Sequence, residues 1–257
     1  MHRLLKNIGE SPMRHFQKEI LDHARLETKP EIPKKVRLCA KILGKDQITN
    51  YLWKYYERES ERRVPFYLPF AYRKELLEHL RRYGKIPKKQ MNLILIDGED
   101  FRTELFFYEN RMDVSYVTIV TPRKEYFEKI QQQAFAEDGL LVDLVTPWED
   151  KNLRGNLVWD FTEQIQKSDC YPKGSICFLP HKKDWKIKEL LQTCDEITAV
   201  TIAHVTIAGY PVNPSFAESL LAMPEILFRK RRCEEVEKWC KTRKWSVKLR
   251  VQTREKP

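Results

Sequence analysis

From residue 91 onward, short apolar runs alternate with stretches of helical periodicity, and this alternation constrains the fold more than any other feature. The runs are rich in Val, Ile, Leu and Thr and cover residues 92–96, 115–121, 140–145, 156–161, 175–179 and 196–207. Helical spacing occurs between several of them, at 123–136, 183–194 and 215–223. Because strands that are apolar throughout need cover on both faces, we predict an α/β fold with a Rossmann-like, mostly parallel sheet covered by helices.

The first 90 residues show helical patterns without strands. Apolar residues recur at helical spacing over 13–27, 34–43, 46–63 and 72–83. The segment 64–70 contains two prolines and predicts a loop, and a basic connector follows at 85–90. We predict two domains, a basic all-helical region at 1–90 and a Rossmann-like domain at 91–257. The second ends in a basic helix at 224–244 and an edge strand at 245–251.

Charge is distributed unevenly along the chain. The net charge is +11 for residues 1–90, −8 for residues 91–224 and +7 for residues 225–257, which gives +10 for the whole chain. Such an asymmetry can attract an acidic partner, or can be satisfied within the chain. The sequence leaves open whether the basic ends face solvent or cover the acidic centre.

The basic ends are the candidate nucleic-acid contacts. Positive side chains neutralise phosphates, and the aromatic residues interleaved with them in the first region can stack on unpaired bases. RNA or DNA is therefore a predicted partner, and its candidate contacts are Arg62, Arg63, Arg229, Lys230, Arg231 and Arg232. The alternative is that the aromatic residues form a core and the basic helices pack on the acidic sheet domain.

Acidic residues follow two of the predicted strands. In parallel sheets the ligand crevice lies at the carboxyl ends of the strands, so these acidic residues are candidates for a shared Mg²⁺ site there. Its predicted ligands are Asp97, Glu99, Asp100 and Asp160, with Asp97 and Asp160 as the catalytic pair. The alternative is that these residues only end strands and cap the following turns or helices.

The run 93–99, Leu-Ile-Leu-Ile-Asp-Gly-Glu, resembles the first strand of PIN-like and NYN-type ribonuclease domains over about ten residues. In those domains an Asp at the end of the first strand helps to hold a metal. The resemblance implies this role for Asp97, with Asp160 as the counterpart at a later strand end.

Nucleotide cofactors have little support in the sequence. The eight glycines include no GxGxxG pattern, and no GxxxxGK[ST] pattern occurs. The sequence therefore argues against NAD, FAD and P-loop nucleotides and leaves Mg²⁺ as the cofactor to consider. No GxSxG motif supports a serine nucleophile.

The cysteines and the start of the chain bear on its location. No apolar run is long enough for a membrane span and no signal peptide is evident at the start, so we expect a cytoplasmic protein with no membrane partner and with reduced thiols. Cys170, Cys177, His181 and Cys194 come nearest to a zinc set, but their spacing favours burial in a core.

These observations predict an α/β protein that binds nucleic acid or another phosphorylated ligand and that, if catalytic, is a Mg²⁺-dependent phosphodiesterase or ribonuclease. The alternative is a non-catalytic Rossmann-like regulatory or protein-interaction module. Whether the chain is an enzyme, which ligand it binds and its oligomeric state are not decided by the sequence.

Overall fold

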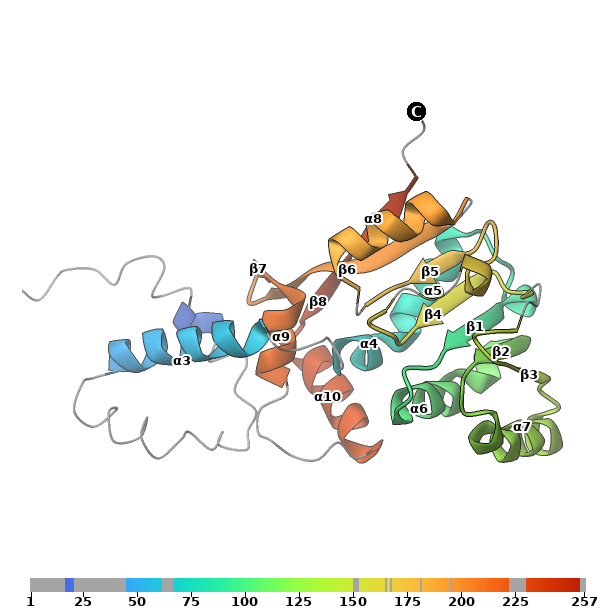
Figure 1. Ribbon diagram of the computed structural model, residues 1–257. Coiled ribbons are helices and arrows are strands. Elements are labelled where there is room, and N and C mark those ends of the chain that lie inside the picture. Colours follow the sequence, from blue (N-terminus) through green and yellow to red (C-terminus); the bar gives the residue numbers. More distant parts are fainter. Residues whose placement is uncertain are drawn as a thin grey trace, which may run out of the picture. The chain divides into compact units, whose positions relative to one another are not determined.

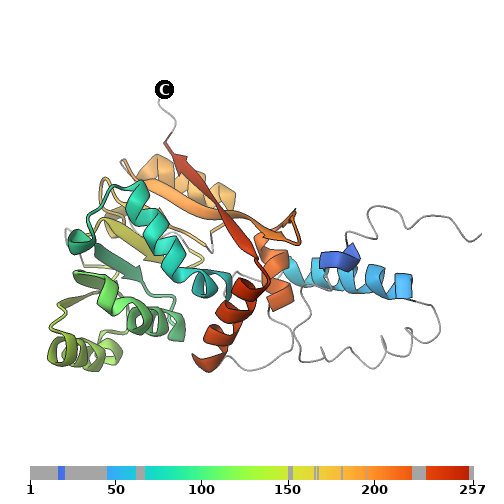
Figure 2. The same ribbon diagram turned by 180° about the vertical axis from the view of Figure 1, so that it is seen from behind.

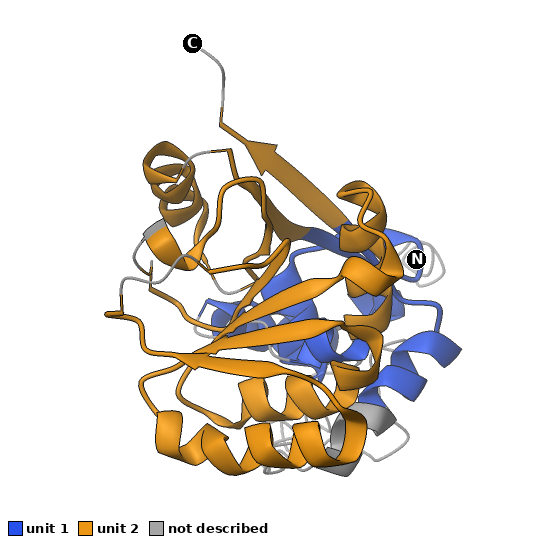
Figure 3. Ribbon diagram, turned by 90° about the vertical axis from the view of Figure 1, so that its right-hand side faces the viewer, with its two compact units in different colours: residues 1–71, 203–248 blue, residues 72–202, 249–257 orange. Residues whose placement is uncertain are grey.

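The computed structural model of the protein describes residues 17–20, 45–61, 67–149, 153–164, 166, 168–180, 182–194, 196–221 and 230–254. Within these ranges the side chains at 45–48, 168 and 230–235 are not described. The chain divides into two compact units (Figure 3). One comprises residues 1–71 with 203–248, and the other, here called the sheet unit, comprises residues 72–202 with 249–257.

The fold is built on an eight-stranded, mostly parallel sheet (Figure 1). The strands are β1 (Asn92–Ile96), β2 (Tyr116–Val120), β3 (Val142–Val145), β4 (Leu157–Asp160), β5 (Ile176–Phe178), β6 (Thr198–Ile207), β7 (Tyr210–Val212) and β8 (Ser246–Thr253). Their order is β3-β2-β1-β4-β5-β6-β7, and β8 also pairs with β6. Strands β1 to β6 pair in parallel and β7 is antiparallel. The predicted Rossmann-like α/β class is confirmed.

The strand order reverses direction between β1 and β4, so this is the switch point at which open α/β sheets offer a crevice. Helices of the sheet unit cover both faces of the strands. They are α5 (Arg73–Tyr83), α6 (Phe101–Asn110), α7 (Lys124–Asp138) and α8 (Asp184–Thr193). Figures 1 and 3 show α6 and α7 on one side of the strands and α8 on the other. Right-handed crossovers that run in opposite directions from the switch point produce this arrangement.

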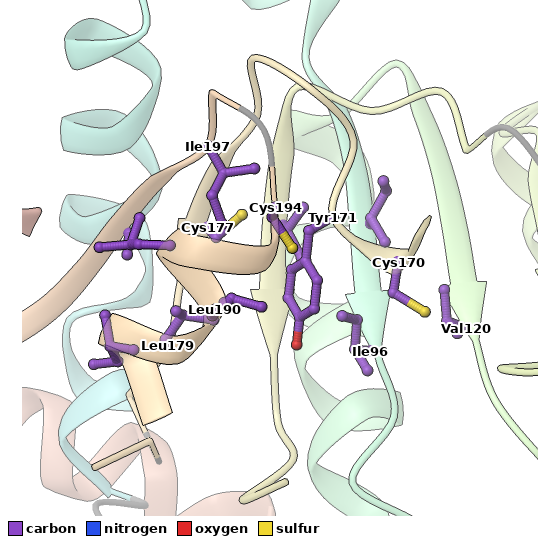
Figure 4. Close-up of a cluster of buried hydrophobic side chains, with 14 residues drawn as sticks. Ile96, Val120, Cys170, Tyr171, Cys177, Leu179, Leu190, Cys194 and Ile197 are labelled. Atoms are coloured by element: carbon purple, nitrogen blue, oxygen red, sulfur yellow. The ribbon is translucent and has the colours of Figure 1, made fainter. Parts of the chain in front are cut away.

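The strand register defines which side chains share a face. Leu95 pairs with Trp159, whose ring lies 4.1 Å from the ring of Phe106 in α6, measured between centroids. Ile96 pairs with Asp160 and therefore lies on the opposite face. That second face is packed by a cluster of fourteen buried residues that includes Ile187 of α8 (Figure 4). The α6 face and the α8 face are thus separate cores.

Helix α5 belongs to the sheet unit although it precedes the predicted boundary at residue 90. Its Leu76, Leu77 and Leu80 are buried, and Figure 2 shows the helix in front of the strands. At its end, a Cβ added to Gly84 would come within 2.5 Å of Ile176 Cδ1 in β5. Glycine therefore permits the close approach of the helix end to the sheet.

The first unit contains α3 (Lys45–Ser60), α4 (Tyr67–Ala71), α9 (Pro214–Leu221) and α10 (Lys230–Thr242). The ring of Trp53 in α3 lies 4.5 Å from that of Phe216 in α9, and Tyr56 contacts the same phenylalanine edge-on. Aromatic residues of the basic N-terminal region therefore take part in a core. This agrees with the alternative interpretation of their helical spacing.

Two segments differ from the prediction. Residues 67–70 were expected in a loop, but 67–71 form α4, because the buried carboxylate of Glu218 accepts hydrogen bonds from the backbone N–H groups of Tyr67 and Leu68. The proline within α4 lies in its first turn, where proline is tolerated. Helix α6 was not predicted, because its consecutive buried residues, Leu105, Phe106 and Phe107, hide the helical period.

The expected helix at 34–43 and most of the one at 13–27 lie outside the described residues, although 17–20 are helical. Among the helices that the structure describes, none has both the length and the apolar character that a membrane span requires.

Candidate functional site

The carboxyl end of β1 carries an ion pair between the buried Asp97 and the partly exposed Arg123. The side chain of Asp97 is fully buried, and its Oδ1 accepts hydrogen bonds from Glu99 N, at 3.1 Å, and from Thr103 Oγ1, at 2.8 Å. Thr121 Oγ1 donates to Oδ2 at 2.7 Å. Arg123 Nε donates to Oδ2 at 3.0 Å and its Nη2 to Oδ1 at 2.9 Å. Both oxygens of Asp97 are thus engaged by groups of the chain itself.

Arg123 is the counterion of this carboxylate. The hydrogen bond to Asp97 raises the pKa of Arg123, and the guanidinium lies 4.9 Å from the ring centroid of Tyr126. The two-point contact joins the end of β1 to the loop after β2 with the fork geometry that arginine and carboxylates prefer. The arrangement is a charge-neutral connection between neighbouring strands.

A second ion pair, in which both side chains are buried, lies at the end of β4. Lys182 Nζ lies 2.5 Å from Asp160 Oδ2, and both side chains are inaccessible to solvent. The other oxygen, Oδ1, accepts hydrogen bonds from the N and Oγ1 atoms of Thr162, each at 2.7 Å. Tyr171 donates its hydroxyl to Oδ2 at 2.6 Å. Asp160, like Asp97, therefore has a cation and several neutral donors around it.

The surroundings of Asp160 shift two neighbouring groups. Burial, and then the charge of Asp160, raises the pKa of Tyr171 well above its usual value. Burial also raises the pKa of Cys177 to about 12. Tyr171 is labelled in Figure 4 beside Cys194 and Ile96, within the core on the α8 face. Both groups are neutral at physiological pH, which suits a packed core.

The two aspartates do not converge. Asp160 pairs in register with Ile96, and successive side chains of a strand alternate between faces, so Asp97 lies on the face opposite to Asp160. Their partners agree, because Thr103 belongs to α6 whereas Tyr171 belongs to the core on the α8 face. The strand ends point the predicted catalytic carboxylates to opposite sides of the sheet.

The remaining predicted ligands serve the turn after β1. Asp100 caps α6, since its Oδ1 accepts a hydrogen bond from Arg102 N at 2.8 Å, and its Oδ2 lies 2.6 Å from Arg102 Nε. Glu99 is exposed and has a φ of 60°, a left-handed conformation that is unusual for glutamate. The described residues contain no group of three or more His, Cys, Asp or Glu side chains placed to hold a metal. The four carboxylates therefore do not fit one shared Mg²⁺ site, and catalysis by Asp97 and Asp160 stays a prediction.

The same geometry bears on the ribonuclease resemblance. It implied that Asp97 and Asp160 would act at one metal site, whereas the register sends them to different faces. Residues 93–96 of the match lie in the buried strand β1, and Asp97 follows directly on its end.

At the switch point the turn after β1 packs closely on the residue that follows β4. In this turn, a Cβ added to Gly98 would lie 2.8 Å from the carbonyl oxygen of Phe161, which follows β4, and 2.9 Å from Arg102 Nη2. Arg102 Nη2 donates a hydrogen bond to the same carbonyl oxygen at 3.2 Å. In Rossmann enzymes the dinucleotide phosphates bind at the N-terminus of the first helix after β1. Here that helix is α6, and the carboxylate of Asp100 caps its N-terminus.

A small cavity lies farther along the same edge of the sheet, at the ends of β2 and β3. It is lined by Val120, Val145, Thr146, Pro147, Glu149, Leu153, Asp169 and Cys170, and the centre of a water molecule could occupy about 10 Å³ of it. The buried hydroxyl of Thr146 has no hydrogen-bond partner there. The space is close to the minimum for a single water molecule and is too small for a nucleotide.

Exposed aromatic residues mark the carboxyl edge of the sheet unit. Phe101 begins α6 and is 43% exposed, Tyr126 lies in the first turn of α7 and is 46% exposed, and Trp148 follows β3 and is 62% exposed. None of the three was predicted as a site residue from the sequence. Their common signal is position, because each follows directly on the end of a predicted strand or begins the helix after it.

The side chains of the predicted nucleic-acid contacts lie outside the part of the chain that the structure describes. Arg62, Arg63 and Arg229 are not among the described residues, and Lys230, Arg231 and Arg232 belong to α10 without described side chains. Many cations elsewhere have anionic partners. The described ion pairs include Arg73 with Glu109, Arg81 and Arg82 with Glu78, Arg111 with Glu137 and Asp138, and Lys124 with Glu149.

The candidate zinc residues are part of a core. Cys170, Cys177 and Cys194 are buried free thiols in the cluster on the α8 face (Figure 4), and His181 lies outside the described residues. Burial of these cysteines is confirmed.

Known proteins show little similarity to this chain. No protein-family model matches the chain, and no curated protein matches it. Among solved structures, the chain is similar to the ligand-free form of 5-ketofructose reductase of Gluconobacter sp. strain CHM43, with a TM-score of 0.35 and 6% sequence identity. The similarity covers 62% of this chain and 60% of the reductase chain. At such values nothing about the function of this chain follows from the reductase.

Proposed function

We propose that this chain is a non-catalytic Rossmann-like module that acts by binding another protein. The observation that carries the proposal is the saturation of the two carboxylates at the switch point. Asp97 accepts five hydrogen bonds from the chain, and Asp160 accepts three and forms an ion pair. A metal would have to displace a bound cation and several neutral donors at each of them, which is costly for buried charges.

The close packing of the turn after β1 supports the same proposal. A dinucleotide needs the backbone of the first turn to approach its pyrophosphate, and a free helix N-terminus below it. Here the turn at Gly98 packs on Phe161, and the N-terminus of α6 is capped by Asp100. The chain uses for its own stability the features by which related folds bind cofactors.

The exposed carboxyl edge supports binding of a protein. Aromatic residues and arginine dominate the energetically important positions of protein interfaces. Phe101 and Tyr126 are exposed in the first turns of α6 and α7, and Trp148 is exposed in the turn after β3. Large exposed aromatic side chains that gather at one edge are more informative than the same residues scattered singly.

The proposal is tested on the purified full chain by calorimetric titration with Mn²⁺, NADPH and ATP, and by hydrolysis of bis-p-nitrophenyl phosphate and labelled RNA in Mn²⁺. We expect neither binding nor hydrolysis. Mn²⁺-dependent hydrolysis that is lost in Asp160→Asn but kept in the distant variant Asp113→Asn would overturn the proposal and restore the catalytic alternative.

A positive test uses a photo-crosslinking amino acid at position 148, with the same group at the exposed position 112 as a control. Crosslinking to a protein from position 148 but not from position 112 supports the proposal. Equal capture at both positions would count against a specific interface.

Nucleic-acid binding by the basic ends is a separate prediction, because its residues lie outside the described side chains. Titration of labelled RNA and DNA at several salt concentrations tests it, and a phosphate contact would show a steep loss of affinity with salt. Absence of binding at low salt would remove it.

A further inference from the structure

We infer that the partner contributes a basic, arginine-rich segment, which binds across the aromatic edge formed by Phe101, Tyr126 and Trp148. This inference rests on the proposed function and adds to it the surface and the chemistry of the partner. It follows from the arrangement of the three rings, from the charges beside them, and from the cation contacts that the chain already makes to aromatic rings.

Contacts between neighbouring loops hold the three rings in one neighbourhood. Arg123 Nη2 donates to the carbonyl oxygen of Asp100, the residue before Phe101, at 2.9 Å. Its guanidinium also lies over the ring of Tyr126. The next residue, Lys124, places its Nζ 2.6 Å from Glu149 Oε1, directly after Trp148. Neighbouring loops of the sheet unit are thus connected in pairs, from the start of α6 through the start of α7 to the turn after β3.

The cations of this surface are already neutralised. Arg123 is paired with the buried Asp97, and Lys124 with Glu149. They are therefore poor phosphate ligands, because a phosphate would have to compete with an existing carboxylate for each of them. This property disfavours a nucleic acid as the occupant of the edge, although exposed rings alone would suit unpaired bases.

The exposed charges beside the rings are mostly negative, with Lys129 of α7 as an exposed cation among them. Glu99 precedes the first ring by two residues, and Glu125 and Glu128 flank Tyr126 in α7, all three with exposed side chains. The central part of the chain, residues 91–224, has a net charge of −8. A surface of this sign attracts a basic partner and repels a polyphosphate, so charge complementarity selects the cationic occupant.

Aromatic rings among carboxylates suit arginine in particular. A guanidinium can lie flat on a ring and still donate hydrogen bonds from its edge to a carboxylate. The chain shows this contact internally, with Arg123 over Tyr126 at 4.9 Å in the sheet unit and Arg243 over Trp239 at 4.5 Å in the other unit. A partner arginine at the exposed Trp148 would repeat the same contact across an interface.

The experiment measures fluorescence anisotropy of labelled twelve-residue peptides with the full chain, at low and at moderate salt. One peptide contains four arginines, a second has lysine in their place, and a third has glutamate. We expect the arginine peptide to bind most tightly, the lysine peptide several-fold less tightly, and the glutamate peptide not at all. Equal binding of the arginine and glutamate peptides, or no binding of either basic peptide, would overturn the inference.

Matched variants locate the site. Trp148→Ala should weaken binding of the arginine peptide by about 5- to 10-fold, since one ring contact is lost, whereas Trp185→Ala, at an equally exposed tryptophan of α8, should leave it unchanged. Charge reversal at Glu125 and Glu128 together should weaken binding by about tenfold or more, with Asp113→Lys as the control. Equal effects of the site and control variants would refute the location.

The outcomes separate this inference from the proposed function. If a protein is crosslinked at position 148 but basic peptides do not bind, the interaction module stands and the partner chemistry is wrong. Tighter binding of single-stranded RNA than of the arginine peptide, lost in Trp148→Ala, would assign the edge to nucleic acid instead. Concentration-dependent dimerisation that Trp148→Ala abolishes would assign it to a second copy of the chain.

Discussion

Replacing Lys182 by methionine removes one partner of a buried ion pair and keeps most of the volume of the side chain. Asp160 would then retain its bonds from Thr162 and Tyr171 but lose its cation, in a position inaccessible to solvent. Loss of one member of a buried pair typically lowers stability by about 3–5 kcal/mol. Because folded domains are stable by about 5–15 kcal/mol, we expect a folded but clearly weakened protein.

The matched double variant combines Lys182→Met with Asp160→Asn. The amide oxygen can still accept from Thr162, its NH₂ group can donate to the hydroxyl of Tyr171, and no uncompensated charge remains. We therefore expect the double variant to be more stable than the single one, with a coupling free energy of about 1.5 kcal/mol or more. Lys183→Met, at the adjacent exposed lysine, is the control and should change stability by less than about 0.5 kcal/mol.

The assay is urea unfolding followed by tryptophan fluorescence. One of the reporting side chains is the fully buried Trp159, the residue before Asp160 in β4. A loss below about 1 kcal/mol in Lys182→Met would refute the reasoning that this pair is a sealed structural element. Equal destabilisation in the single and double variants would refute the coupling between the two residues.

Three further predictions concern other parts of the chain. In Glu218→Gln the amide NH₂ would face a backbone N–H at the start of α4, so unfolding free energy should fall by about 1–3 kcal/mol, while the exposed Glu57→Gln stays within about 0.5 kcal/mol of the parent in the same urea titration. Glu99→Gly relieves a left-handed φ of 60° and should raise stability by about 1 kcal/mol, which a calorimetric scan detects, and a lower melting temperature would contradict it. Since the folded pKa of Cys177 is about 12, above its ordinary value near 9, its contribution to stability is complete below pH 9 and is lost as pH rises toward 12. Native protein at pH 8 should accordingly leave this thiol unmodified by Ellman's reagent until it is unfolded, and rapid labelling of Cys177 without unfolding would show that it is not buried.

Much of the fold was predictable, because the apolar runs that form β1 to β6 match local strand propensity. The run 92–96 coincides with β1. Helix α4 could not be predicted, since its start depends on Glu218, a residue about 150 positions away. Local sequence cannot report a hydrogen bond made across such a separation.

The candidate site was predicted in position but not in direction. Asp97 and Asp160 do end neighbouring strands, yet the face that each occupies depends on the register of β1 against β4. Their cationic partners carried a usable signal, because Arg123 and Lys182 each follow a strand end and a proline. Pairing the acid after one strand with the base after the next would have predicted structural ion pairs in place of a metal site.

The enclosure of Asp160 and Lys182 has a practical consequence for handling the protein. Dissolved ions screen charges that water can reach and leave walled-off ones almost untouched. Concentrated sodium chloride should therefore release a positively charged partner from the exposed aromatic edge without breaking the enclosed ion pair. A high-salt wash would then recover folded protein that can be used again.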